Sequence, residues 1–512
     1  MPPPYILEPG RRVNAWDYEF EWTSEHYTPE QLKPLIYTYD ELASKALDRL
    51  DEIAAKSRSS KPSPHQSNPA ASPPLVSPPP YSDSTSPPPY IDSTTPPPPS
   101  SSCPHSRSQQ LFSLLSFHGP SDPILSPLWT QLTTLPPWVN FSQITSGQRI
   151  FYRYLGPSIV GLTFQALLGG FGSARIATTL SLTGGFSPRF ARRRLLETFQ
   201  HVLDITSSIP DITPPSGKGF VSTVKVRLLH ASVRRKILTM AKEKEGWFDV
   251  GENGIPCNDL DSVGTITAFS TMLLFIGFPR QGVWLSETEK EDYLALWRYV
   301  AYLLGTPTEP FESVKTAKLW LESLIVSEIR PSKVSRQLGE NMIASLALTP
   351  PTYASADFLR AEGWWLNGPA LARELGIERP RWWYLVLVGG QCGYFMGVSY
   401  FKKYLMPRRW EERQIERLKR ILREVTVKEA GGREAGFEFR YVPSWRQLHN
   451  GVRGDEKGAV EEEGSRPKRD GFRNRWTEWR NLMAAVLLLT VLGWFGWLSA
   501  RMVCRGVVSM VT

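Results

Sequence analysis

Most apolar residues in the chain recur at intervals of three and four positions, which is the spacing of a helix face. Thr28-Pro-Glu-Gln31 predicts a helix start, with Thr28 as the N-cap and Gln31 completing a capping box. Gly305 and Gly376 are expected to end two later helices. Between residues 109 and 405 no strand pattern of period two stands out, so we expect an all-α fold. The main helices are predicted over 40–55, 190–202, 223–237, 261–278, 287–304, 312–327, 358–375 and 408–427.

One apolar stretch, residues 482–500, has no charge over about 19 residues, enough to cross a bilayer core of about 30 Å. More cations precede this stretch than follow it, so the positive-inside rule places the long N-terminal part in the cytosol, held by a single C-terminal anchor. Segments 151–171 and 384–400 are also apolar, but glycines interrupt both. We expect two buried helices there, although the sequence leaves membrane insertion of either segment open.

The composition divides the chain into five parts. Residues 57–108 are rich in proline and serine and lack an apolar period, so they are predicted to form a disordered linker. The predicted organisation is a small helical N-terminal segment over 1–56, the linker over 57–108, a helical domain over 109–405, a charged connector over 406–480 and a transmembrane helix over 481–503.

Three Pro-Pro-x-Tyr motifs end at Tyr5, Tyr81 and Tyr90. In the polyproline II conformation, such motifs are ligands of WW domains. Proline-rich sequences also produce the motif by chance, so both interpretations stay open.

The charge and the cysteines narrow the classes of partner and site. The net charge is +9, but many cations gather ahead of residues 482–500, which suggests membrane lipid as a partner and no nucleic acid. The four cysteines are widely spaced and form no CxxC pair. This spacing argues against a disulfide framework or a zinc site and favours a reducing compartment.

Histidine supplies the candidate metal ligand. Of seven histidines, only His118, His201 and His230 fall in the expected core. The sequence contains no phosphate-binding glycine loop and no HExxH or GxSxG motif. If a metal is bound, the economical arrangement is one protein ligand and a cofactor that supplies the others, as heme does.

His230 lies on the helix predicted over 223–237, with Arg227 and Arg234 about one turn to either side. A neutral imidazole is a common iron ligand, and flanking arginines can pair with porphyrin propionates. A lone histidine on such a helix is more often an ordinary core residue, so this stretch by itself decides nothing.

Five motifs follow one another along the chain. They are Arg194-Leu-Leu-Glu-Thr198, Val226-Arg-Leu-Leu-His-Ala-Ser-Val-Arg234, Gly254-Ile-Pro256, Trp297-Arg-Tyr-Val-Ala-Tyr-Leu-Leu-Gly305 and Leu371-Ala-Arg-Glu-Leu-Gly376. In order and spacing, this set resembles the catalytic domain shared by rubber oxygenases (latex-clearing proteins) and MpaB-type oxygenases of the endoplasmic reticulum. The resemblance covers roughly residues 140–400.

The resemblance implies a globin-like helical core around heme b, with His230 as the proximal iron ligand. Arg227 and Arg234 are then candidates for contacts with the cofactor. An endoplasmic reticulum location for the membrane anchor is also implied.

The same resemblance assigns roles on the other side of the heme. Arg194 and Thr198 match the distal arginine and threonine of the family's RxxKT pattern, but Glu197 stands where the family has lysine. This departure puts the handling of dioxygen and the substrate in doubt, and it makes Glu197 a candidate base. Without the resemblance, Arg194 and Glu197 would be interpreted as a surface ion pair.

Two functions follow. The first is a membrane-anchored, heme-dependent oxygenase that acts with O2 on a hydrophobic, unsaturated substrate such as an isoprenoid or a lipid. The second is a non-catalytic, tail-anchored adaptor that presents its Pro-Pro-x-Tyr motifs to WW-domain proteins.

Overall fold

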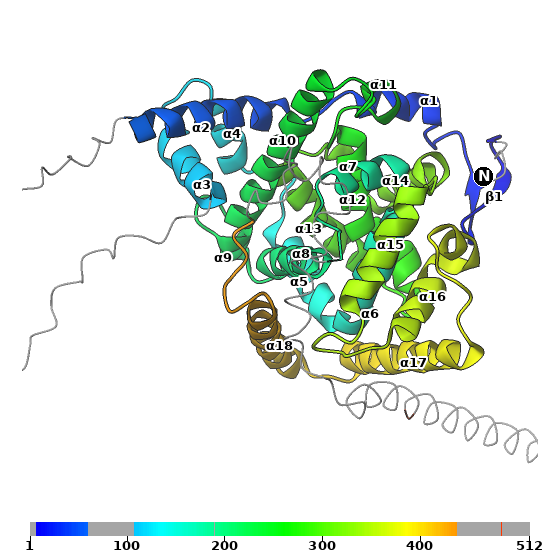
Figure 1. Ribbon diagram of the computed structural model, residues 1–512. Coiled ribbons are helices and arrows are strands. Elements are labelled where there is room, and N and C mark those ends of the chain that lie inside the picture. Colours follow the sequence, from blue (N-terminus) through cyan, green and yellow to red (C-terminus); the bar gives the residue numbers. More distant parts are fainter. Residues whose placement is uncertain (1–6, 60–106, 189, 438–482, 484–512) are drawn as a thin grey trace, which may run out of the picture.

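The computed structural model describes residues 7–59, 107–188, 190–437 and 483, and these residues are mostly helical (Figure 1). The all-α class is confirmed in this coarse sense. Several predictions lie outside the described residues: most of the proline-rich linker, the three Pro-Pro-x-Tyr tyrosines and the apolar stretch 482–500.

The described elements follow the predicted helices closely. The first half contains β1 Arg11–Ala15, β2 Tyr18–Trp22, α1 Pro29–Leu32, η1 Lys33–Ile36, α2 Glu41–Ser59, α3 Arg107–His118, α4 Ser126–Thr133, α5 Phe141–Arg153, α6 Leu155–Val160, η2 Gly161–Leu168, α7 Ala174–Leu182, α8 Ala191–Ile205, α9 Ile209–Ile212 and α10 Lys218–Glu243. The second half contains α11 Val250–Asn253, α12 Asp259–Phe269, η3 Leu273–Gly277, η4 Pro279–Gln281, α13 Glu287–Leu304, η5 Glu309–Phe311, α14 Val314–Glu328, α15 Lys333–Leu346, α16 Ala356–Glu374, α17 Trp382–Tyr404 and α18 Arg408–Glu429.

Helix α10 lies at the centre of the larger apolar core. It packs against α2, α3, α8, α9 and α13, and α13 in turn packs along α5 (Figure 1). Val224, Leu228 and Ala231 of α10 are buried in this core. Apolar residues occur on most sides of α10, so its stability depends on neighbours that cover it all round.

A second apolar cluster joins η2, α15, α16 and α17. Helix α17 runs along the lower edge of the molecule in Figure 1. Helix α16 is kinked at Gly368, whose φ of +79° is unfavourable for a residue with a side chain, and Pro369 follows it.

The N-terminal segment contains an antiparallel hairpin, β1–β2, which corrects the prediction of a purely helical segment. Phe20 and Trp22 are buried, and glutamates alternate with the apolar residues of β2, so a period-two signal was present. The turn consists of Trp16 and Asp17, with φ of +57° and +60°. No glycine or asparagine marks this turn in the sequence, which hides the hairpin.

The predicted helix ends are confirmed. Thr28 caps α1 in a full capping box with Gln31. Helix α13 spans the predicted 287–304, and Gly305 follows it with φ of +73°. Gly376, with φ of +79°, lies just beyond α16.

Helix α18 lies in the segment predicted as a charged connector outside the helical domain, but it packs against α8 and α5. Arg153 Nε lies 2.6 Å from the Glu411 carboxylate, and Arg423 lies 2.7 Å from Asp204. The folded domain therefore extends beyond residue 405, because α18 completes its surface.

Among the described residues, one helical stretch is long and apolar enough to cross a membrane, Asp259–Gly277. Its 18-residue apolar window is 72% buried, which agrees with the central position predicted for 261–278. In segment 151–171, η2 is largely buried and packs against α16, as expected for a core helix. In segment 384–400, α17 packs one side against α16 but exposes its other side, so the prediction of a buried helix is wrong for that side.

Candidate functional site

Helix α10 positions His230 beside α8. The neighbouring helices are tied together where His201 Nδ1 of α8 lies 2.9 Å from the Ser222 hydroxyl of α10. His230 is half-buried, and Arg194 of α8 is close enough to act on it electrostatically. The structure thus brings together His230 and the arginine that begins the predicted distal motif.

His230 is held in its neutral form. Burial lowers the pKa of His230 to about 4, and the positive charges of Arg234 and Arg194 act in the same direction, whereas Asp40 opposes them. Within the described part of the chain, no hydrogen bond reaches either ring nitrogen of His230. A neutral imidazole with unpaired nitrogens has a lone pair that a metal can accept.

Arg227 and Arg234 are largely occupied by protein acceptors. Arg227 forms four hydrogen bonds: two to the Asp40 carboxylate at 2.6 and 2.9 Å, one to Gln131 and one to the Leu303 carbonyl. A guanidinium has five N–H groups, so only one remains.

Arg234 is similarly engaged. It donates to the carbonyls of Pro256, Cys257 and Asp40 and to the Ser44 hydroxyl. Both arginines hold the N-terminal segment against α10, and Arg234 also holds the loop before α12. Their predicted contact with a cofactor stays a prediction, and these bonds leave little donor capacity for it.

The three residues predicted opposite His230 have different environments on α8. Glu197 is buried, and its carboxylate accepts a hydrogen bond of 3.2 Å from Arg193 Nε. Thr198 is exposed, and its hydroxyl donates to the carbonyl of Arg194, one turn earlier. Glu197 is therefore the residue of this trio with a buried functional group.

Sequence reasoning missed two neighbours of His230. His201 is buried, and burial, together with His230, lowers the pKa of His201 to about 4. Asp40 comes from the N-terminal segment and acts on His230 through space. His201 belonged to the short list of core histidines, whereas no sequence signal places Asp40 near α10.

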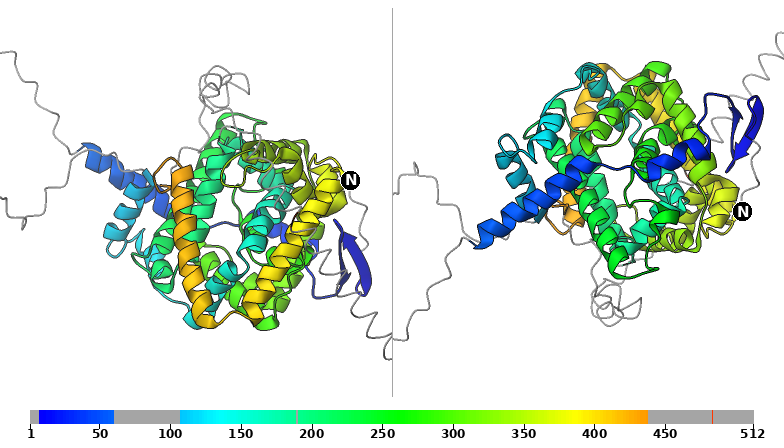
Figure 2. Two further views of the ribbon diagram at one scale, coloured as in Figure 1. Left: turned by 90° about the horizontal axis from the view of Figure 1, so that it is seen from below. Right: turned by 90° about the horizontal axis from the view of Figure 1, so that it is seen from above.

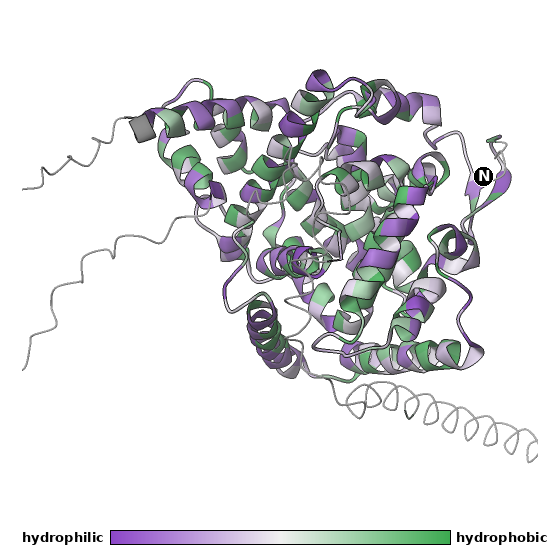
Figure 3. Ribbon diagram, in the orientation of Figure 1, coloured by the Kyte–Doolittle hydropathy of each residue, from purple (hydrophilic) through white to green (hydrophobic). Residues whose placement is uncertain are grey.

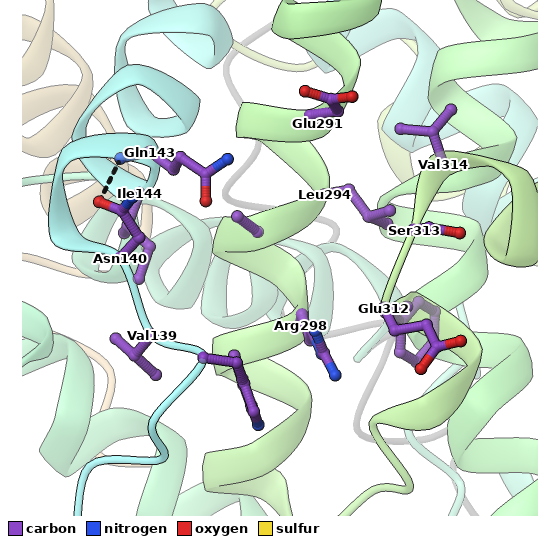
Figure 4. A pocket seen from close by; sticks show the side chains of 13 residues that line it. Val139, Asn140, Gln143, Ile144, Glu291, Leu294, Arg298, Glu312, Ser313 and Val314 are labelled. Carbon is purple, nitrogen blue, oxygen red and sulfur yellow. Dashed lines mark hydrogen bonds between the residues drawn. The ribbon is translucent and has the colours of Figure 1, made fainter.

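A pocket of about 200 Å³ lies elsewhere, between α5, α13 and the start of α14 (Figure 4). The Arg298 guanidinium stacks over the Trp138 ring, 4.3 Å from its centre, and Glu291 and Glu312 line the same pocket. No residue of α8 or α10 lines it. This small, polar pocket is thus separate from His230.

The described residues contain no group of three or more His, Cys, Asp or Glu side chains that could hold a metal ion. A metal bound by His230 would therefore need further ligands, and a cofactor could supply them.

Residues 152–390 match the family model described as the ER-bound oxygenase mpaB/B'/rubber oxygenase, catalytic domain. This segment belongs to that family. Arg194, Glu197, Thr198 and His230 all lie within this family segment.

A solved structure titled "Structure of Latex Clearing Protein LCP in the closed state" is similar to this chain, with 16% sequence identity and a TM-score of 0.47. The likeness covers 60% of this chain and 80% of that one. No curated protein matches the sequence.

Proposed function

We propose that the protein is a membrane-anchored, heme-dependent oxygenase that acts with O2 on a hydrophobic, unsaturated substrate. The observation that carries this proposal is His230, a neutral imidazole with unpaired nitrogens inside the family segment. The apolar stretch 482–500 supports the membrane anchor.

His230 fits the role of a heme ligand, but the two flanking arginines have few free donors for the heme propionates. His230 is suited to hold the iron, because burial and two arginines keep its ring unprotonated. When bound, heme would supply the redox chemistry toward dioxygen. Arg227 and Arg234 hold the protein scaffold, and their hydrogen bonds leave little donor capacity for an anionic group on a cofactor.

Glu197 sets this chain apart from the RxxKT pattern that the family resemblance implies. A lysine there would be a proton donor, whereas a buried carboxylate accepts a proton. We assign Glu197 the role of a base that removes a proton from the substrate.

Heme content tests the proposal directly. The full chain, purified in detergent, should show a Soret band and about one heme per chain. His230→Ala should lose both, whereas His118→Ala, on α3, should keep them. A colourless, iron-free wild-type protein would exclude a heme oxygenase.

The three Pro-Pro-x-Tyr motifs favour a second candidate function, an adaptor for WW-domain proteins. In that case Tyr81→Ala with Tyr90→Ala should abolish WW binding and the cellular phenotype, and His230→Ala should leave both intact. If His230→Ala abolished the cellular phenotype and the double tyrosine variant left it intact, the oxygenase would be supported.

A further inference from the structure

Helix α17 exposes a row of large apolar side chains. Trp382, Tyr394 and Tyr404 are 75%, 58% and 70% exposed, and Val386 and Phe401 are 39% and 52% exposed. At about 100° per residue, these five positions lie within about 120° of one another around the helix. They form one continuous face on the lower edge of the molecule, where α17 is coloured mainly as hydrophobic in Figure 3.

The opposite side of α17 is covered by protein. Leu387, Val388 and Cys392 are buried in the cluster shared with α16. Helix α17 is therefore apolar on both sides: its inner side packs against α16, and no described residue covers its outer side. Isolated exposed apolar residues are common, but a contiguous row of them marks an interaction surface.

Neighbouring segments extend this row. Trp410, near the start of α18, is 65% exposed. Trp284 is 59% exposed, and its backbone N–H donates to the Tyr400 hydroxyl of α17 at 3.1 Å. We call the resulting surface the aromatic face; it comprises Trp284, Trp382, Tyr394, Phe401, Tyr404 and Trp410.

Cations frame the aromatic face at both ends of α17. Arg379 and Arg381 are exposed before the helix, and Arg408 and Arg409 are exposed after it. From Arg379 to Trp410 the sequence contains no aspartate or glutamate. A helix that lies at the surface of a bilayer is typically rich in tryptophan, tyrosine and arginine, because the rings sit among the headgroups and the cations contact anionic lipids.

The same charges argue against a second copy of the chain as the occupant. A two-fold contact through α17 would bring the arginine pair at one end of one helix against the arginine pair at the other end of its partner. A parallel contact would also align like charges. Anionic lipid headgroups complement the arginines at both ends of α17, although Arg408 also pairs with Glu412 of α18.

We propose that the aromatic face rests in the headgroup region of an anionic bilayer, with α17 parallel to the membrane surface. Helix α17 has 23 residues, so it would lie along about 35 Å of that surface. This inference deepens the membrane part of the proposed function and does not depend on heme.

Lipid photocrosslinking of the full chain tests the proposal. The protein is reconstituted in vesicles of phosphatidylcholine and phosphatidylserine that contain a photoactivatable phosphatidylcholine, and crosslinked peptides are mapped by mass spectrometry. We expect crosslinks within α17. Trp382→Ser with Tyr394→Ser and Phe401→Ser should lower their yield about tenfold. Phe117→Ser, at a 77% exposed position on α3, is the matched control and should change nothing, because α3 (cyan) lies on a different side of the molecule from α17 (yellow) in both views of Figure 2.

The outcomes separate this inference from the membrane anchor. Crosslinks in α17 without any in 482–500 would support the aromatic face and contradict the anchor. Crosslinks in 482–500 without any in α17 would overturn the inference. Protein–protein crosslinks through α17 in place of lipid crosslinks would also overturn it, in favour of a protein partner. The unfolding midpoint of the triple variant should match that of the wild type, because all three side chains are exposed.

Discussion

Glu362 shows how a single buried carboxyl group links the fold to pH. It lies in the apolar cluster of α16 and α17 and accepts a hydrogen bond of 2.6 Å from Gln391. Among the described residues no cation pairs with it. Burial raises the pKa of Glu362 to about 7.

Stability should therefore fall as the pH rises from about 4.5 through about 7. Over that range the folded protein keeps the Glu362 proton that the unfolded chain releases. Glu362→Gln should be nearly neutral at about pH 5 and should stabilise the protein by about 3 kcal/mol at about pH 8. Urea unfolding at both pH values measures this. Glu374→Gln, an exposed position on the same helix, is the control; an unchanged pH dependence in Glu362→Gln would contradict the assignment.

At this scale the sequence singled out His230 and Arg194 as candidates, but it gave no sign that Asp40 lies near them. His230 stood out because few core histidines compete with it and arginines flank it. Its electrostatic environment depends on Arg194 from α8 and Asp40 from the N-terminal segment. Arg227 and Arg234 looked suited to an anionic cofactor, since a sequence shows charge but not which acceptors the fold brings to it.

Ion pairs join the α2 region to helix α10 at both buried and exposed positions. The Asp40 carboxylate, just before α2, pairs with Arg227, whose side chain is 2% exposed. Asp48 of α2 pairs with Arg235 at 2.7 Å, but the side chains are 63% and 38% exposed, and Arg235 also pairs with Asp51 at 2.6 Å. Burial should decide how much each pair contributes.

Asp40→Asn should destabilise the protein by about 3 kcal/mol, because it leaves the Arg227 charge buried without a counter-charge. Asp48→Asn, the same substitution at the exposed pair, should cost less than about 1 kcal/mol. Urea unfolding midpoints compare the two. Equal effects would mean that the existing hydrogen bonds from Arg227 to Gln131 and Leu303 are enough to hold its buried charge.

Helix positions were predictable from local signals, whereas helix partners were not. The ends of α1, α13 and α16 follow from caps and glycines within a few residues. The β1–β2 hairpin escaped prediction because its turn lacks the usual residues, although β2 alternates clearly. Helix α18 is so rich in charge that it resembles a solvated helix, and its docking rests on ion pairs with distant residues.

On the scale of the whole molecule, one ionic cluster joins four helices. Glu289 of α13 accepts from Lys403 of α17 at 2.7 Å and from the Tyr154 hydroxyl at 2.8 Å. Burial opposes ionisation, but these bonds and the Ser286 backbone lower the pKa of Glu289 to about 2. Arg153 of α5 bridges Glu289 and Glu411, so the cluster fixes α17 and α18 against the core.

This cluster is what should hold the aromatic face in place. Glu411 is 4% exposed and pairs with Arg153, whereas its neighbour Glu412 is 54% exposed and pairs with the surface residue Arg408. Glu411→Gln removes the ion pair that holds α18 to Arg153, so it should raise amide hydrogen exchange in α18. The cost should be limited to about 2 kcal/mol, because Arg153 keeps Glu289 as a counter-charge. Glu412→Gln should stay within about 0.5 kcal/mol of the wild type. If Glu411→Gln left exchange in α18 unchanged, apolar packing around Ile415 would be sufficient to dock the helix. The folded domain would then extend to residue 429 independently of the ionic cluster.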